Sequence, residues 1–273
     1  GSQNNIRAAY SSGTPAVGVG AGNVSVIVDE TADCAEAAAQ IVASKTFDNA
    51  TSCSSENSVV VLDQVYDVLI AALESRGAKM LTAGEQASLR QLMWTDGKLN
   101  PAVIAQSAGQ IAKMAGIHCE ADSGIKVLLV QESGAGSEYP FSGEKLSPVL
   151  TLYRAGNFDA ALAQVARIYD YQGAGHSVGI HTRDEKRAMR IALELPTCRV
   201  IVNQAHCFAT GGSFDNALPF SLSMGCGSWG GNSISENMNY RHYLNTVRVV
   251  SRIPAQEVLP EDLLGDYWTR YGK

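Results

Sequence analysis

Apolar residues along this chain follow two different periods, one typical of buried strands and one typical of helices. Val24–Val28 and Ser58–Leu62 are short runs rich in β-branched residues, which indicate buried strands. Between them, apolar residues at helical spacing follow Asp33, which predicts a helix with Asp33 and Glu36 as its capping box. The same reasoning predicts strands at Lys126–Gln131, Val149–Tyr153, Val178–Thr182, Arg199–Asn203 and Leu244–Ser251, and helices around residues 65–72, 159–169 and 184–195.

Strand and helix patterns therefore alternate over most of the sequence. This alternation is typical of an α/β fold in which helices flank a mainly parallel sheet. Residues 211–232 are rich in glycine and serine and are predicted to be irregular.

Composition narrows the possible partners. The chain has 273 residues, of which 45% are hydrophobic and 18% charged, as in a globular domain with a real core. A net charge of −6 and the absence of a basic stripe argue against a nucleic-acid partner. No apolar run is long enough to span a bilayer and the first residues do not resemble a signal peptide, so no membrane partner is expected.

Six cysteines are scattered without the spacing of a disulfide scaffold. We therefore expect reduced thiols and a cytoplasmic location. The adjacent pairs His118-Cys119 and His206-Cys207 suit a tetrahedral zinc ion badly, and the sequence has no Cys-x-x-Cys, so no metal site is predicted.

The run Gly18-Val-Gly20-Ala-Gly22 has part of the spacing of a dinucleotide-binding loop. That loop needs a strand before it and a helix after it, whereas a predicted strand follows here and the third glycine of the motif is missing. The pattern alone favours a tight turn or close backbone packing, since glycine tolerates both.

Cys53 is the candidate nucleophile of the sequence. It lies between a predicted helix and a predicted strand, among small polar residues that leave a thiol reachable. A thiolate in such a place can attack a carbonyl carbon. Spacing alone leaves an inert buried thiol equally open.

The segment Phe47-Asp-Asn-Ala-Thr-Ser-Cys53-Ser-Ser-Glu resembles the active-site segment of the CoA-acylating aldehyde dehydrogenases. Other segments similar to that family, some before this one and some after it, occur in the same order as in the family. They are Arg7–Gly13, Val17–Asn23, Asp29–Asp33, Glu144-Lys-Leu-Ser-Pro148, Gly175-His-Ser177 and Met224–Asn237.

The resemblance implies a domain organisation as well as a fold. Members of the family are much longer and carry most of their nucleotide-binding domain before the point that corresponds to residue 1. We therefore expect the end of that domain at residues 1–33, an aldehyde-dehydrogenase-like catalytic domain at 34–218, and a C-terminal return and oligomerisation segment at 219–273. A homodimer or homotetramer is implied.

By resemblance, Cys53 attacks the aldehyde, hydride passes to NAD or NADP, and coenzyme A takes the acyl group from the cysteine thioester. His176 matches a histidine that assists proton transfer or contacts the coenzyme A thiol. Glu144 matches the residue that binds the nicotinamide ribose, and Gly20 and Gly22 fall in a cofactor-binding segment. Hydrolytic relatives carry a water-activating glutamate in the stretch matching Val17–Asn23, and its absence here favours thiolysis over hydrolysis.

The substrate is expected to be a small aldehyde. Asn203, His206 and Phe208 fall where the family builds its substrate tunnel, and polar His206 suggests a polar or anionic aldehyde, with Arg241 or His242 nearby. These residues, with the segment 239–245, resemble the branch that acts on sulfoacetaldehyde. Two alternatives stay open: a cysteine hydrolase using Cys53 with His176, and a catalytically incomplete fragment that only oligomerises.

Overall fold

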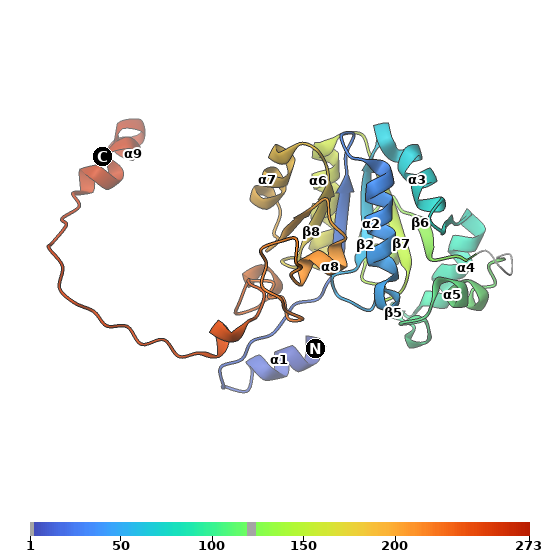
Figure 1. Ribbon diagram of the computed structural model, residues 1–273, viewed down its shortest axis with the longest axis horizontal. Coiled ribbons are helices and arrows are strands. Elements are labelled where there is room, and N and C mark those ends of the chain that lie inside the picture. Colours follow the sequence, from blue (N-terminus) through green and yellow to red (C-terminus); the bar gives the residue numbers. More distant parts are fainter. Residues whose placement is uncertain (1–2, 119–123) are drawn as a thin grey trace. The chain divides into compact units, whose positions relative to one another are not determined.

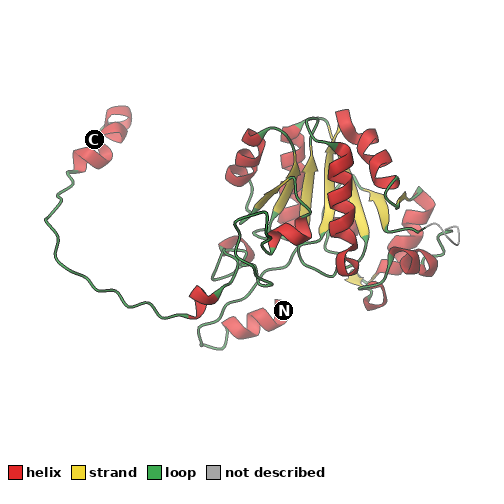
Figure 2. Ribbon diagram, in the orientation of Figure 1, coloured by secondary structure: helices red, strands yellow, loops and turns green. Residues whose placement is uncertain are grey.

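The computed structural model describes residues 3–118 and 124–273. Contacts divide the chain into a large unit, Gly1–Asn239, and a small one, Tyr240–Lys273. The large unit is a sheet covered by helices on both faces (Figure 2). The small unit contains a 3-10 turn at Tyr240–Tyr243 and helix α9 at Pro260–Tyr271.

Seven parallel strands form the sheet, in the order β3-β6-β7-β2-β1-β8-β9. Their bounds are β1 Val24–Val28, β2 Glu56–Leu62, β3 Ala78–Met80, β6 Val127–Gln131, β7 Val149–Ala155, β8 Val178–His181 and β9 Val200–Val202. The predicted α/β fold with a mainly parallel sheet is therefore confirmed. Because β1 pairs with both β2 and β8, the sheet includes strands on both sides of residue 33, where the sequence predicted a domain boundary.

Successive residues of the central strands pack on opposite faces, as the period of two requires. Val59 and Val61 of β2 lie on one face of the sheet, which α2 (Cys34–Thr46) and α3 (Tyr66–Glu74) cover. Val60 and Leu62 contact the other, covered by α6 (Phe158–Tyr171) and α7 (Glu185–Glu194). Figure 1 shows these layers, with α2 in blue lying along the sheet.

The remaining elements lie around this sandwich. Helices α4 (Ala83–Met93) and α5 (Ala108–Met114) cover the β6 side, and β4 (Trp94–Thr95) with β5 (Lys98–Leu99) forms a small antiparallel hairpin. Helix α1 spans Gln3–Tyr10 and α8 spans His206–Thr210.

Two sequence-based expectations need correction. The Asp33 carboxylate caps α2 by accepting from Ala35 N and Glu36 N, but Glu36 Oε1 accepts from Gln40 and does not complete a capping box. The strand predicted at Leu244–Ser251 is wrong, because this segment has no regular structure. A strand needs a partner for its backbone groups, and in the part of the chain that the structure describes, no ladder pairs with these residues.

Candidate active site

The sheet brings three predicted site residues to one edge. Cys53 precedes β2, Glu144 precedes β7 and His176 precedes β8, and these three strands are parallel members of one sheet. The residues that precede parallel strands meet at the amino edge of a sheet. Sequence positions more than 120 residues apart, Cys53 and His176, are in contact there.

The thiol of Cys53 lies against an imidazole ring. His176 Nε2 is 3.4 Å from Cys53 Sγ, and His176 Nδ1 is 2.7 Å from the hydroxyl of Ser177. Both His176 and Ser177 are buried, whereas Cys53 is half-buried. The contact with Ser177 therefore holds the imidazole ring of His176, while Cys53 stays partly exposed to solvent.

The turn before the nucleophile has an unusual backbone. Asp48, Asn49 and Ala50 have φ values of 47°, 49° and 61°, in the left-handed region. Asparagine and aspartate tolerate this conformation better than alanine does. The turn is held by Asn49 Nδ2, which donates to Ala105 O at 2.9 Å, and by Thr51 Oγ1, which donates to Asp48 Oδ2 at 2.6 Å.

Gly22 and Gly20 pack directly against the site. A β-carbon on Gly22 would lie 2.1 Å from the carbonyl oxygen of Cys53, and one on Gly20 would lie 2.9 Å from Cys226 Sγ. No side chain fits at those distances. Close packing against protein atoms thus accounts for both glycines, as the sequence pattern favoured, and their role in cofactor binding stays a prediction.

Burial raises the pKa of Cys53, and the negative charge of Glu144 raises it further. The neighbouring Ser54 hydroxyl and the backbone N–H of Cys53 oppose this rise in the pKa. Burial also lowers the pKa of His176 to about 3, with help from the positive charge of Arg199. The resting pair is therefore a thiol beside a neutral imidazole.

Glu144 is held next to the thiol by a buried lysine. Lys145 Nζ donates to the carbonyl oxygens of Phe141, Gly143 and Asn57, at 2.6, 3.0 and 3.0 Å. These bonds tie the loop that carries Glu144 to the start of β2. Burial raises the pKa of Glu144 to about 7, against the attraction of Lys45 and Lys145.

Lys45 and Glu56 form a buried pair of charges close to Cys207. Burial lowers the pKa of Lys45 and raises that of Glu56, and the attraction between them opposes both shifts. With Glu144, whose charge acts on both Lys45 and Cys53, they form a cluster of buried titratable groups. Clusters of this kind are typical of functional sites.

Arg199 connects the loop at residues 224–237 to the backbone of His176, just before β8. Its guanidinium donates to His176 O and Gly225 O at 3.0 Å, and to Asn237 Oδ1 at 2.8 Å. This loop places Cys226 against Gly20 and Gly175, so the segment 224–237 forms a wall beside the thiol.

The three predicted substrate residues lie in different places. His206 is 1% exposed, and its Nε2 is 2.8 Å from the Ser177 hydroxyl. Phe208 is 44% exposed and packs edge-on against Phe47, with ring centroids 5.1 Å apart. Asn203 follows β9 at the carboxyl edge of the sheet, where its amide bonds to both backbone groups of Thr182.

The structure therefore brings Cys53, His176, Glu144 and His206 together and places Asn203 elsewhere. Arg241 and His242 belong to the small unit. Sequence reasoning gave no role to Ser177, Lys145 or Arg199. Ser177 and Lys145 directly follow the predicted site residues His176 and Glu144, and this adjacency could have indicated them. The sequence around Arg199 shows only that it lies at the start of a predicted strand.

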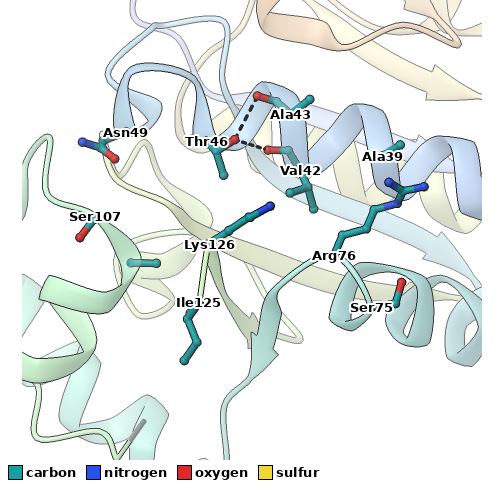
Figure 3. Close-up of a pocket in the computed structure, with 11 residues that line it drawn as sticks. Ala39, Val42, Ala43, Thr46, Asn49, Ser75, Arg76, Ser107, Ile125 and Lys126 are labelled. Carbon is teal, nitrogen blue, oxygen red and sulfur yellow. Dashed lines mark hydrogen bonds between the residues drawn. The ribbon is translucent and has the colours of Figure 1, made fainter. Parts of the chain in front are cut away.

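A cavity of about 680 Å³ lies apart from this cluster, between the end of α2, the end of α3 and the start of α5. Figure 3 shows Lys126 extending toward α2, with Arg76 nearby. Among the described residues, its lining has two cations but no cysteine, histidine or carboxylate. The cavity therefore lacks the groups that the Cys53 cluster offers for covalent chemistry.

Known proteins resemble this chain in sequence and in fold. Residues 5–132 match the sequence model of the aldehyde dehydrogenase family. This part of the chain thus contains sequence of the aldehyde dehydrogenase family. An acetylating aldehyde dehydrogenase from Geobacillus thermoglucosidasius superimposes with a TM-score of 0.87 at 36% identity, over 94% of this chain and 57% of that one.

Two curated relatives are similar to this chain over nearly its whole length. The chain is 58% identical to the sulfoacetaldehyde dehydrogenase (acylating) of Cupriavidus necator, over 100% of this chain and 55% of the relative. It is 40% identical to the succinate-semialdehyde dehydrogenase (acetylating) of Clostridium kluyveri, over 91% of this chain and 54% of the relative. The chain thus spans about half the length of these relatives.

Within residues 3–118 and 124–273, no helix combines the length and apolar character needed to cross a membrane. In the same residues, no three His, Cys, Asp or Glu side chains are grouped to hold a metal ion. The five cysteines described are free thiols, and Cys119 lies outside the described residues.

Proposed function

We propose that the protein oxidises a small aldehyde to an acyl-CoA through a thioester on Cys53, with hydride transfer to NAD or NADP. The observation that carries this proposal is the 3.4 Å contact between Cys53 Sγ and His176 Nε2 beside Glu144. Both relatives described above are named as acylating or acetylating dehydrogenases, which supports the use of coenzyme A.

The residues around the thiol have distinct tasks in this reaction. The Cys53 thiolate adds to the aldehyde carbon, and the neighbouring backbone N–H of Cys53 and the Ser54 hydroxyl favour the charged form of the sulfur. NAD or NADP, when bound, would supply the acceptor for the hydride. The thioester that remains on Cys53 exchanges with the thiol of coenzyme A, which leaves as acyl-CoA; its thiol proton passes to solvent, and Cys53 returns as a thiolate.

Glu144 fits the expected contact with the nicotinamide ribose. Its side chain is half-buried at the amino edge of the sheet, and no hydrogen bond to a described residue occupies its carboxyl group. A carboxylate is an acceptor for a ribose hydroxyl. We assign NAD or NADP to this side of the thiol, and we propose that the nucleotide-binding domain ends within residues 1–33, before the buried strand β1.

Sulfoacetaldehyde is the substrate that we favour. Support comes from the 58% identity to the Cupriavidus necator enzyme, which carries that substrate in its name. Phe208, which is partly exposed, stays a candidate for the substrate side. We further propose a homodimer or homotetramer that forms through residues 219–273, which include the exposed Val247 and Val249; a monomer by light scattering would reject this.

The decisive assay measures nucleotide reduction with sulfoacetaldehyde, acetaldehyde and succinate semialdehyde, with and without coenzyme A. We expect the Cys53→Ala variant to lose at least about a thousandfold in turnover, because the proposed carrier of the acyl chain is gone. Cys34→Ala is the matched control, since Cys34 lies in α2 within the core and should leave turnover nearly unchanged. Nucleotide reduction that ignores coenzyme A would reject the acylating reaction.

A cysteine hydrolase is a second candidate, because Cys53 and His176 are within contact distance. Its third group would orient His176 Nδ1, and Ser177 occupies that position. Release of acid from a thioester without any nicotinamide nucleotide would favour this candidate over the dehydrogenase.

A further inference from the structure

Four side chains form an unbranched row behind the nucleophile. His206 Nε2 is 2.8 Å from Ser177 Oγ, Ser177 Oγ is 2.7 Å from His176 Nδ1, and His176 Nε2 is 3.4 Å from Cys53 Sγ. His206, Ser177 and His176 are each at most 1% exposed. The Tyr169 hydroxyl also donates to Ser177 O, which fixes the backbone at the middle of the row.

A serine hydroxyl has a single hydrogen, so it donates to one imidazole and must accept from the other. Two arrangements follow. In the first, His206 Nε2–H donates to Ser177, Ser177 donates to His176 Nδ1, and His176 Nε2–H faces the sulfur. In the second, every hydrogen points the other way, and a bare His176 Nε2 accepts from the Cys53 thiol.

The far end of the row decides between the two arrangements. His206 Nδ1 is buried and has no hydrogen-bond partner among the residues that the structure describes. It faces the backbone of Gly179, where an added β-carbon would lie 2.9 Å away. The first arrangement leaves a lone pair at Nδ1, and the second leaves an N–H. Buried N–H groups without partners are the rarer of the two in proteins, because a stranded donor is the more costly.

We propose that Ser177 and His206 are positioning residues that fix the tautomer of His176, so that an Nε2–H faces Cys53. His176 then acts as a hydrogen-bond donor to the thiolate and not as the base that removes the thiol proton. The thiol proton leaves to solvent, and the thiolate that forms accepts the hydrogen bond. Such a bond favours the charged form of the sulfur.

This arrangement deepens the proposed function, on which it rests only in taking Cys53 as the nucleophile. A neutral ring that already carries its proton at Nε2 cannot take a proton from water there. The thioester on Cys53 is therefore protected from hydrolysis until another thiol arrives.

The test measures how fast iodoacetamide alkylates Cys53 as a function of pH in the full-length protein. Tryptic cleavage gives the peptide Thr46–Arg76, in which Cys53 is the only cysteine, so mass spectrometry reports this thiol alone. The assay uses neither aldehyde nor nucleotide. A failure of the proposed dehydrogenase activity therefore cannot be mistaken for a failure of the positioning role.

Ser177→Ala should lower the alkylation rate at pH 7 about tenfold and shift the pH profile upward by about one unit, the effect of losing a hydrogen bond to the charged form. Ser177→Thr keeps the hydroxyl and should stay within about twofold of the unmodified protein. His206→Gln keeps an N–H donor and should behave likewise, whereas His206→Leu should lose about threefold. A wild-type profile in folded Ser177→Ala would overturn the proposal.

His176 provides a second comparison that does not depend on Ser177→Ala folding. His176→Gln keeps an N–H donor but has no basicity, whereas His176→Ala has neither. We expect His176→Gln to retain most of the thiol reactivity that His176→Ala loses. Equal losses in both variants would show that His176 acts as a base, which contradicts the proposal.

Other charged or titratable groups also face the sulfur, and all of these variants leave them unchanged. They are Glu144, Arg199, Cys207 and Cys226. Differences between matched variants therefore report the row of Cys53, His176, Ser177 and His206.

Discussion

Buried charged groups at the two edges of the sheet differ in how completely they are paired. At the carboxyl edge, Asp29 follows β1 and is fully buried, but Arg187 Nη1 lies 2.7 Å from its carboxylate. Burial alone would raise the pKa of Asp29, yet hydrogen bonds from Thr182, Thr31 and Arg187 lower it below its ordinary value. The carboxylate is charged, paired and inert.

At the amino edge, buried groups are left only partly satisfied. Lys45 Nζ, Glu56 Oε2 and His206 Nδ1 have no hydrogen-bond partner among the described residues. Burial lowers the pKa of Lys45 and raises the pKa values of Glu56 and Glu144. Charged groups at the carboxyl edge therefore stabilise the fold, whereas burial at the amino edge moves pKa values away from their ordinary range, as is typical of functional sites.

The largest test of this contrast removes Arg187. Arg187→Ala should lower the free energy of unfolding by about 3 kcal/mol, because it leaves the Asp29 carboxylate buried without its cation. Arg183→Ala is the matched control: Arg183 is 74% exposed and 3.9 Å from Asp33, so its loss should cost less than about 0.5 kcal/mol. Urea unfolding measures both variants. Equal small losses would show that the carboxyl edge does not depend on the pair.

Glu144 tests the opposite edge through thiol reactivity. Because its charge raises the pKa of Cys53, Glu144→Gln should increase the alkylation rate of Cys53 about threefold above pH 7. Below pH 7 the Glu144 carboxyl is protonated, so the variant and the unmodified protein should converge. Exposed Glu36→Gln should change neither range. A uniform increase at every pH would mean that Glu144 acts by packing.

The smaller of the two predicted effects on stability concerns the left-handed turn before Cys53. Ala50 is buried with a φ of 61°, so Ala50→Gly should stabilise the fold by about 1 kcal/mol through relief of strain. Ala43→Gly makes the same chemical change inside α2 and should destabilise by about 1 kcal/mol. Thermal unfolding of the two variants should shift in opposite directions; a shift of Ala50→Gly to lower temperature would contradict the assignment of strain.

Periodicity predicted the strands of the sheet well where a segment is buried on both faces. Val59 and Val60 of β2 are fully buried on opposite sides, and such runs have little alternative to a central strand. The short strands β3, β4 and β5 were missed, because two or three residues carry too little pattern. Leu244–Ser251 has the apolar pattern of a strand but lacks a partner ladder, which sequence pattern does not supply.

The sequence indicated the candidate nucleophile and part of its surroundings. Cys53 and His176 lie in recognisable motifs, and the fold brings them into contact. Ser177, Arg199 and Lys145 act through three-dimensional neighbours that come from distant strands. His206 was expected on a substrate wall, whereas the structure buries its ring against Ser177. Contacts of this kind depend on side-chain packing across the sheet, which local pattern does not encode.

The central claim is that the sulfur of Cys53 carries the acyl group during turnover. The most direct measurement mixes the full-length protein with sulfoacetaldehyde and NAD or NADP, omits coenzyme A, and determines the mass of the peptide Thr46–Arg76 after acid quenching. The account predicts a mass increase equal to the acyl group, which disappears when coenzyme A is added. Reduced nucleotide that accumulates with coenzyme A present, while this peptide never gains mass, would contradict it.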